Sequence, residues 1–235
     1  MEIIIRASGE RTENECIRLA SKQGNVHVIR AFPFGEAIRQ TYKLALTFNQ
    51  KWISVIDADV LLNPDVLNKA IKHLNSLRNN HKIFCLDGKT KDKIMKKVRR
   101  AGVHIYQREL LNKAYQFIDD KKIKPESNVR HKMEEIGFST HSPQILFGLH
   151  DYEQYYKDIW RKSVCQTQKL SKMAKSRKNK WKKLGETDKD YFVIYHAYHY
   201  GRNLNEKIFI DARKTYDAEK ILKQLGVEEK KLYEK

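Results

Sequence analysis

The feature of this sequence that most constrains its fold is a repeated alternation between short apolar runs and longer amphipathic segments. The runs at 2–7, 26–32, 52–57 and 82–88 are rich in β-branched or aromatic residues, which favour strands. Between them, apolar residues recur at the three- and four-residue spacing of a helix face, as they do within 66–76. Strands that alternate with helices predict an α/β fold, with a mostly parallel central sheet and helices on both faces.

Two segments carry local signals for the start of a helix. Thr12 and Glu15 have the spacing of a capping box, in which two side chains bond to the free backbone amides, so we expect a helix that begins there and ends near Gly24. Asn63 and Pro64 have the composition of a helix start, and we expect Asn63 to cap the helix that follows.

The composition fits a folded protein with a sizeable core. The chain has 235 residues, of which 40% are hydrophobic and 32% are charged, a balance typical of globular proteins. We expect one large α/β domain over residues 1–160, and a basic, mainly helical extension over 161–235 that packs on the same domain.

Signals for export or membrane insertion are missing from the sequence. No apolar run approaches the roughly 20 residues that cross a bilayer, and the amino terminus lacks a basic region followed by a long apolar core. Cys16, Cys85 and Cys165 lie far apart without a CxxC spacing, which argues against a disulfide framework and against a structural zinc site. We therefore expect a protein of the reducing cytoplasm.

The net charge of +18 predicts attraction to an anionic partner, which is a nucleic acid, an anionic membrane surface or a phosphorylated substrate. The charge is concentrated in residues 168–183, which hold eight Lys or Arg and no acid. Two interpretations of this segment stay open, because a solvated helix face or mobile loop has the same composition as a binding surface.

Asp57 and Asp59 follow the third predicted strand directly, in the stretch "WISVIDADVLL". Ligands gather at the carboxyl ends of the strands in such sheets, and backbone alternation sends both carboxylates to the same side. Two like charges this close are unfavourable unless a cation joins them, and Mn²⁺ or Mg²⁺ with a phosphorylated ligand is the natural partner. The alternative is a pair of loop acids that cap the next helix, a position for which Asn63 is already available.

Several segments together resemble the nucleotide-sugar glycosyltransferases of the GT-A fold. The first part of the resemblance is "FPFGEAIRQTYKLAL" with "VIDADVLLNP", in which a D-x-D follows a central strand. The second part is "KPESNVRHKMEEIGFSTHSPQILFGLHDYEQYY", in which an acid opens a helix and a strand leads to a histidine. The resemblance covers about residues 2–156. It implies a Rossmann-like GT-A fold and metal-dependent transfer of a sugar, in polysaccharide biosynthesis, from a nucleotide diphosphate sugar to a saccharide or lipid-linked acceptor. A UDP-sugar is the favoured donor.

The same resemblance implies roles for individual residues. It implies that Asp59 binds the metal, together with Asp57 and with His150, whose imidazole follows the apolar run "QILFG". An ordinary core or surface histidine remains the alternative for His150, and an exposed helix charge remains the alternative for Arg39. The residues that it places around the nucleotide-sugar are Arg6, Ala7, Ser8, Arg11, Arg39, Asp57 and Ala58.

An inverting transfer also needs a carboxylate that accepts the proton of the acceptor hydroxyl. Glu126 occupies the position where the family's helix-opening acid pair often provides this base, although Ser127 stands here in place of the second acid. Asp151 is the rival candidate and Glu153 the third, and an ordinary surface carboxylate is the alternative for each.

The segment Lys169–Lys183 has two further interpretations, which are contact with anionic lipid headgroups and a loop that orders over the donor. His196 and His199 lie in an aromatic segment that we expect to form a helix packed on the sheet.

Two other functions are weighed. A sugar-nucleotide nucleotidyltransferase normally has a Gly-rich loop after the first strand, where "RASGERT" has a single Gly, and a nucleic-acid-binding protein is suggested by charge alone. We expect no nucleic-acid partner.

Overall fold

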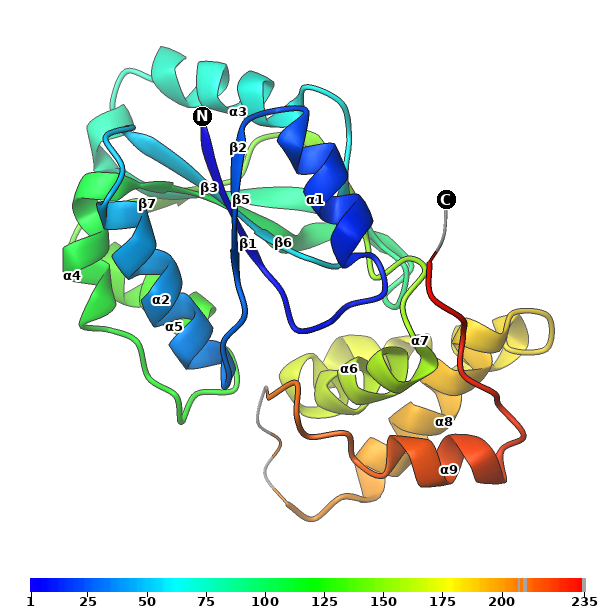
Figure 1. The fold of residues 1–235 in the computed structure, drawn as a ribbon. Coiled ribbons are helices and arrows are strands. Elements are labelled where there is room, and N and C mark those ends of the chain that lie inside the picture. Colours follow the sequence, from blue (N-terminus) through cyan, green and yellow to red (C-terminus); the bar gives the residue numbers. More distant parts are fainter. Residues whose placement is uncertain (207, 209–210, 234–235) are drawn as a thin grey trace.

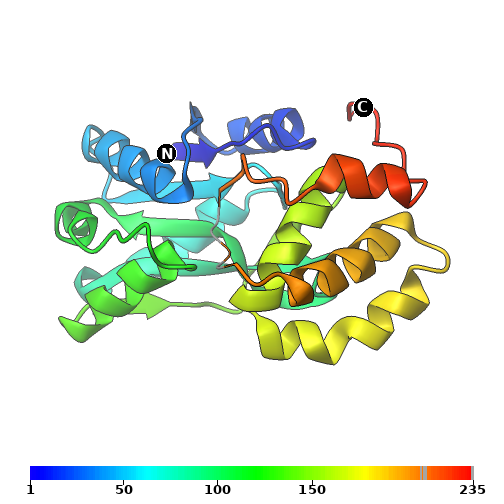
Figure 2. The same ribbon diagram turned by 90° about the horizontal axis from the view of Figure 1, so that it is seen from below.

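The computed structural model describes residues 1–206, 208 and 211–233, and it contains one curled β-sheet with helices on both faces (Figure 1). A separate group of helices lies at one end of the sheet (Figure 2). The predicted α/β class, with a central sheet flanked by helices, is confirmed.

The described part of the chain forms an eight-stranded sheet with the order β2-β1-β3-β6-β5-β8-β4, and β7 pairs with β5 outside this path. β1 pairs in parallel with β2 and β3, whereas β6 runs antiparallel to both β3 and β5. The sheet is mixed because β6 runs back between these two strands and because β4 pairs antiparallel with β8. The strands are β1 (Glu2–Arg6), β2 (Asn25–Ile29), β3 (Trp52–Asp57), β4 (Val60–Leu62), β5 (Ile83–Asp92), β6 (Lys97–Gln107), β7 (Ser139–His141) and β8 (Leu146–His150).

The helices cover the sheet from both sides. Side-chain alternation in β1 shows the two layers, because Ile3 and Ile5 pack with α1 and α3, whereas Ile4 packs with α2, α4 and α5. All three isoleucines are fully buried. The helices are α1 (Glu13–Ser21), α2 (Phe34–Leu46), α3 (Val66–Ser76), α4 (Leu111–Tyr115), α5 (Pro125–Glu135), α6 (Tyr156–Lys169), α7 (Ser171–Leu184), α8 (Lys189–Asn203) and α9 (Ala218–Gln224), with short 3₁₀ turns η1 (Asn80–Lys82) and η2 (Arg108–Leu110).

Helices α6 to α9 share a hydrophobic cluster of their own, separate from the two clusters on the sheet faces. Trp160 and Trp181 are buried in it, and Ile94 and Met95 from the β5–β6 connection join it. The aromatic helix α8 packs against α6 and α7, so the expectation that it packs on the sheet is wrong. The reason is that these helices bury one another's apolar faces, which periodicity alone does not reveal.

Both predicted helix starts differ from the structure in their hydrogen bonds. Thr12 does precede α1, but it makes no side-chain cap, because its hydroxyl donates to the backbone oxygen of Ala58 at 3.1 Å. Asn63 is not the cap of α3, since Asp65 holds that position and the Asn63 amide donates to the backbone oxygen of Leu146 at 2.9 Å. Both side chains instead tie loops to the sheet.

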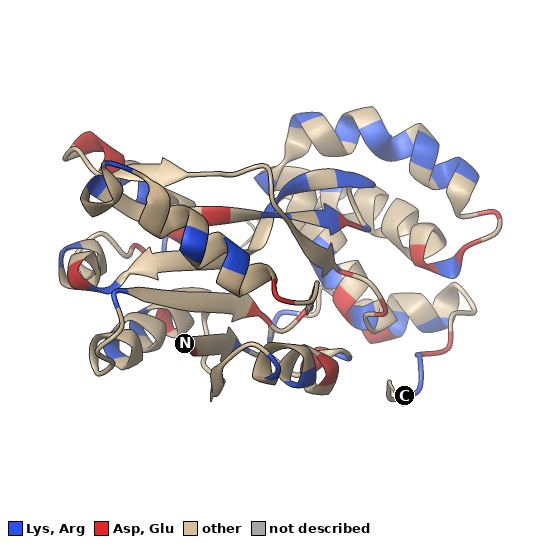
Figure 3. Ribbon diagram, turned by 90° about the horizontal axis from the view of Figure 1, so that it is seen from above, with Lys and Arg blue, Asp and Glu red and all other residues tan. Residues whose placement is uncertain are grey.

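None of the helices in the described ranges is long and apolar enough to cross a membrane. The surface of α7 has the opposite character, because Lys and Arg line much of its length (Figure 3). Lys172, Lys175, Lys178, Lys180 and Lys182 are exposed on it. Within the part of the chain that the structure describes, these five lysines make no ion pair with a carboxylate.

Candidate active site

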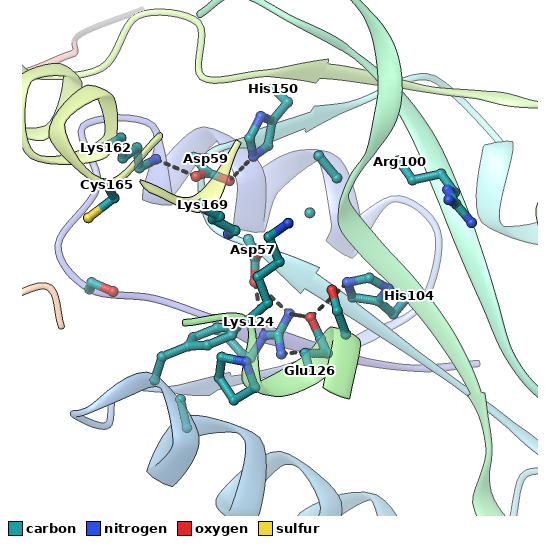
Figure 4. Close-up of a pocket in the computed structure, with 18 of the residues that line it drawn as sticks. Asp57, Asp59, Arg100, His104, Lys124, Glu126, His150, Lys162, Cys165 and Lys169 are labelled. Carbon is teal, nitrogen blue, oxygen red and sulfur yellow. Dashed lines mark hydrogen bonds and ion pairs between the residues drawn. The ribbon is translucent and has the colours of Figure 1, made fainter. Parts of the chain in front are cut away.

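A cavity of about 510 Å³ lies where the ends of the central strands meet α6 (Figure 4). Its volume is in the range of sites that hold small-molecule ligands. The residues used below that line it are Arg6, Ala7, Ser8, Glu10, Asp57, Asp59, Asp87, Arg99, Gly102, His104, Lys124, Glu126, His131, His150, Asp151, Arg161, Lys162, Cys165, Gln166 and Lys169.

One wall of the cavity carries an acidic cluster of Asp59, His150 and Asp151. Strand pairing places them together, because Val60 of β4 lies opposite His150 of β8, and the backbone amide of Asp151 donates to the backbone oxygen of Asp59 at 3.2 Å. Asp92 of β5 fixes the imidazole, with an oxygen 2.9 Å from His150 Nδ1. Residues that are about ninety positions apart in the sequence therefore form one buried group.

Lys162 of α6 brings positive charge into this acidic cluster. Its ammonium group pairs with Asp59 and, at 2.7 Å, with Asp151. Burial opposes the ionisation of both carboxyl groups, but Lys162 and His150 outweigh burial and lower the pKa of each. Burial also opposes the imidazolium form of His150, yet the two carboxylates raise its pKa to about 10. His150 is therefore protonated at neutral pH when Lys162 alone occupies the cluster.

The donor set of this cluster fits a divalent cation. The ligand atoms of Asp59, His150 and Asp151 all lie within 4.8 Å of one another, and carboxylate oxygens with an imidazole suit Mn²⁺. Asp59 Oδ1 is buried without a hydrogen-bond partner, and His150 Nε2 is 3.5 Å from it. A buried carboxylate oxygen without a hydrogen bond is available as a donor atom to a cation. Binding of a cation here requires that Lys162 withdraws and that His150 loses its proton.

A second buried network forms the floor of the cavity around Glu126. Arg6 Nη1 donates to Glu126 Oε1 at 2.7 Å, and the Tyr106 hydroxyl donates to the same oxygen at 2.6 Å. His104 Nε2 lies 2.9 Å from Glu126 Oε2. Burial alone would raise the pKa of Glu126, but Arg6 and His104 hold it well below its usual range. Glu126 is thus a permanently charged anchor that joins β1, β6 and α5.

Asp57 belongs to this second network and not to the acidic cluster. Arg6 Nε donates to Asp57 Oδ1 at 2.9 Å, and the carboxylate still lines the cavity. Ala7 and Ser8 also line it, as expected for the end of β1. Asp57 and Asp59 both line the cavity, but Asp59 lies in the turn between β3 and β4, so the expected strand alternation does not relate their side chains. Arg6 and Lys162 bind the two carboxylates separately.

Three of the predicted site residues lie outside the described lining of the cavity. Arg11 donates to the backbone oxygens of Glu153 and Lys231, and Arg39 pairs with Asp120 at 2.8 Å. Ala58 is fully buried behind the rim, where its amide donates to the backbone oxygen of Arg6 at 3.0 Å. The role of each toward a nucleotide remains a prediction.

Sequence reasoning missed the wall that α6 contributes. Arg161, Cys165 and Lys169 share one face of this helix at four-residue spacing, and Lys162 and Gln166 follow them. This spacing is visible in the sequence, but it does not reveal that the face meets the strand ends.

Glu10 is a further residue of the cavity that the sequence did not single out. It lies in the loop after β1, where its carboxylate accepts a hydrogen bond from the Ser8 amide at 2.6 Å. Burial raises its pKa to about 7. A carboxyl group that titrates near neutral pH is suited to proton transfer.

Comparisons with known proteins bear on the fold. No protein-family model matches the sequence, and no curated protein matches it. Among solved structures, the mannosyltransferase PcManGT from Pyrobaculum calidifontis, in complex with GDP-Man and Mn²⁺, has a similar fold. The TM-score is 0.51 at 13% identity, over 87% of this chain and 70% of that one. The chain therefore has an α/β fold like that of this mannosyltransferase.

Two nucleotide-handling enzymes are also similar at lower scores. CMP:2-keto-3-deoxy-manno-octonic acid synthetase, complexed with CTP, has a TM-score of 0.40 at 8% identity over 63% of this chain and 91% of that one. The 4-diphosphocytidyl-2C-methyl-D-erythritol synthase from Anaerococcus prevotii has a TM-score of 0.39 at 12% identity, over 60% of this chain and 68% of that one.

Proposed function

We propose that this protein is a metal-dependent glycosyltransferase, which transfers a sugar from a nucleotide diphosphate sugar to a saccharide or lipid-linked acceptor. The observation that carries the proposal is the buried cluster of Asp59, His150 and Asp151 at the strand ends, in which one oxygen of Asp59 has no hydrogen-bond partner. The fold shared with a mannosyltransferase in complex with GDP-Man and Mn²⁺ supports it.

In this proposal Asp59, His150 and Asp151 hold Mn²⁺ or Mg²⁺ at one end of the cavity. The bound cation supplies charge stabilisation for the departing nucleotide diphosphate. Lys162, released from the two carboxylates, provides a second positive charge beside the diphosphate. Ala7, Ser8 and Asp57 border the nucleotide-sugar at the end of β1 and β3. Arg6 orients Asp57 through its hydrogen bond.

The proton of the acceptor hydroxyl needs a basic group in an inverting transfer. Glu126 and Asp151, the two predicted candidates, are weak proton acceptors, because neighbouring cations hold the pKa of each well below its usual range. Glu10 lines the same cavity with a pKa of about 7. We therefore assign Glu10 as the base and assign charge-holding roles to Glu126 and Asp151. Glu10→Gln should abolish transfer while donor binding persists.

The acceptor side involves the basic surface of α7. We place the protein in the cytoplasm, where exposed lysines such as Lys175 and Lys178 contact an anionic membrane that carries the lipid-linked acceptor. Each basic residue near such a surface contributes about 1 kcal/mol.

A thermal-shift screen tests the donor class and the metal together. UDP and GDP should raise the melting temperature of the native protein in the presence of Mn²⁺ and have little effect without it. In Asp59→Ala, the rise in melting temperature that depends on Mn²⁺ should disappear. Equal shifts in both proteins would refute the metal role of Asp59. Absence of any shift with every nucleoside diphosphate would refute the donor class.

A sugar-nucleotide nucleotidyltransferase is the second candidate, and the cations Lys124, Lys162 and Lys169 around the cavity favour it, because they also suit a nucleoside triphosphate. The two candidates release different products. A glycosyltransferase releases a nucleoside diphosphate from the nucleotide sugar. A nucleotidyltransferase joins a nucleoside triphosphate to a sugar phosphate and releases pyrophosphate from the triphosphate. Detection of pyrophosphate with CTP or another triphosphate would favour the second candidate.

A further inference from the structure

The positive charges around the cavity fall into two groups according to their partners. Most of them are neutralised within the described residues, as Arg6 is by Asp57 and Glu126, and Arg99 by Asp92. Lys124 at the start of α5 and Lys169 at the end of α6 also line the cavity, but neither makes an ion pair in that part of the chain. Their charge is therefore available to a ligand.

Lys124 and Lys169 act on the same region of the cavity, although they come from different elements. Figure 4 shows both side chains next to Asp57, between the acidic cluster and the Glu126 network. Burial, then Arg99 and Lys124, make the charged form of Lys169 less favourable. Asp57 favours the charge of Lys169 but does not outweigh burial, Arg99 and Lys124, so a further anion beside the two ammonium groups would be favourable.

The adjoining wall of α6 adds two buried polar atoms without hydrogen-bond partners, although the Arg161 guanidinium pairs with Asp158 through Nη2. Arg161 and Gln166 are each 7% exposed and line the cavity, and neither Arg161 Nε nor Gln166 Oε1 has a hydrogen-bond partner. Buried polar atoms are normally paired, so these two point to a polar ligand along the same helix face.

We infer that Lys124 and Lys169 form an anion subsite that binds a phosphate group on the second substrate. The inference rests on the proposed function, because it names the class of acceptor as a phosphate ester. The acidic cluster and its cation account for the donor diphosphate, so the two unpaired lysines are left for a different anion. Phosphate oxygens can accept charge-assisted hydrogen bonds from both ammonium groups.

Calorimetric titration with two phosphate esters tests the subsite. The protein is first saturated with Mn²⁺ and with UDP or GDP, so that the donor site is filled, and is then titrated with hexyl phosphate or with glucose 6-phosphate. Hexanol and glucose are the neutral counterparts. We expect one ester to bind the native protein, and Lys124→Gln and Lys169→Gln each to weaken it about tenfold, since each removes one charge-assisted contact.

Lys72→Gln is the matched control, because Lys72 is an exposed lysine of α3 outside the cavity lining. It should leave both ester titrations unchanged. None of the three variants should change nucleotide affinity by more than about twofold, which is small beside the tenfold loss of ester affinity expected for the two cavity lysines. Tighter binding of hexyl phosphate would identify a lipid phosphate as the source, and tighter binding of glucose 6-phosphate would identify a soluble sugar phosphate.

Three results would overturn the subsite: binding of neither ester, equal binding to native and variant proteins, or a loss of nucleotide affinity in the lysine variants as large as the loss for the ester. The proposed function fails separately. If the esters bind in a lysine-dependent way to a protein that binds no nucleoside diphosphate, the subsite stands and the donor assignment falls. If the nucleotide binds with Mn²⁺ and the esters do not, the donor assignment stands and the subsite falls.

Discussion

Lys162 is the residue whose position sets the state of the acidic cluster. Its ammonium group lies between Asp59 and Asp151, with 15% of its side chain exposed. Burial opposes its charge, but Asp151 and Asp59 raise the pKa of Lys162 above its usual range. In the proposed metal site, a divalent cation would therefore compete with this lysine for the same two carboxylates.

Removal of this competitor should have two opposite effects. Lys162→Met should lower the free energy of unfolding of the metal-free protein by roughly 3–5 kcal/mol, because two buried carboxylates lose the ammonium group between them and keep only His150 as a cationic partner. The same change should tighten Mn²⁺ binding by roughly tenfold, or about 1.4 kcal/mol, because the cation no longer displaces an ammonium group. Urea unfolding and calorimetric titration measure the two effects.

Lys157→Met, on the exposed side of α6, is the control and should show neither effect. Native-like Mn²⁺ affinity in Lys162→Met would show that the lysine and the metal do not share a site.

Two buried histidines should make stability depend on pH. His104 is buried against Glu126 and Asp87, and these contacts outweigh burial and raise its pKa well above its usual range, while the pKa of His150 is about 10. The folded protein therefore holds protons that the unfolded chain has lost above about pH 6.5, so the contribution of the two histidines to stability is full below that pH and falls as the pH rises towards their folded pKa values.

Urea unfolding between pH 7.5 and 9.5 checks this dependence. His104→Gln should reduce the slope of the free energy of unfolding against pH. His131→Gln should keep the native slope, because 70% of the His131 side chain is exposed. A slope in His104→Gln equal to that of the native protein would contradict the assignment.

Individual residues differed in how far the sequence could predict them. Asp59 and His150 were predicted to share a site, and the structure brings them together, because one follows a buried strand and the other ends an apolar run. Lys162 and Glu10 were not predicted. A lysine in a basic helix and an acid in a loop look like surface residues until the fold shows what they face.

At the scale of elements, the pairing of β4 with β8 determines the geometry of the candidate site. The sequence predicted the strand of Asp57 and the apolar run before His150, but not that the short segment after Asp59 is itself a strand. It also did not predict that β6 runs antiparallel inside the sheet, because the direction and register of strand pairing depend on partners distant in sequence.

Gly102 of β6 tests this arrangement without changing a ligand. Its φ is +70°, and a Cβ atom there would lie 2.5 Å from Val60 Cγ2 and 2.9 Å from His150 Cδ2. Gly102→Ala should therefore displace His150 and weaken Mn²⁺ binding at least about tenfold, or 1.4 kcal/mol. Calorimetric titration measures the loss.

Gly137→Ala is the matched control for this prediction. Gly137 also has a positive φ, of +92°, but a Cβ atom there meets nothing within 4 Å. It should carry a similar backbone strain and leave Mn²⁺ affinity unchanged. An equal loss in both variants would mean that strain and not the contact with His150 is responsible.

At the scale of the whole molecule, the group of helices α6 to α9 lies at one end of the sheet (Figure 2), and α6 supplies one wall of the cavity. The basic character of this region was visible in the sequence, and its helices were expected. Its placement against the strand ends was not predictable, because it depends on how four amphipathic helices and the β5–β6 connection pack together.

The exposed face of α7 should bind anionic membranes. A triple variant of Lys175, Lys178 and Lys182 to Gln should weaken binding to vesicles that contain phosphatidylglycerol by about 3 kcal/mol, because each lysine contributes roughly 1 kcal/mol. Co-sedimentation measures the affinity, and added salt should reduce it.

A variant with the same loss of charge elsewhere is the control for membrane binding. Lys22, Lys69 and Lys72 are exposed and lie outside α7, and their replacement by Gln should have a smaller effect. Equal losses in the two triple variants would show that net charge, and not α7, governs the association.

The central claim is that Asp59, His150 and Asp151 bind one divalent cation. Electron paramagnetic resonance of free Mn²⁺ tests it directly, because the sharp signal of the aqueous ion decreases when the protein binds it. The native protein should bind one Mn²⁺ per chain, more tightly with UDP or GDP present, and Asp65→Asn, at an exposed helix start, should bind it equally well. Asp59→Asn should leave the ion free; if Asp59→Asn binds Mn²⁺ as the native protein does, or if the native protein leaves the signal unchanged, the claim is contradicted.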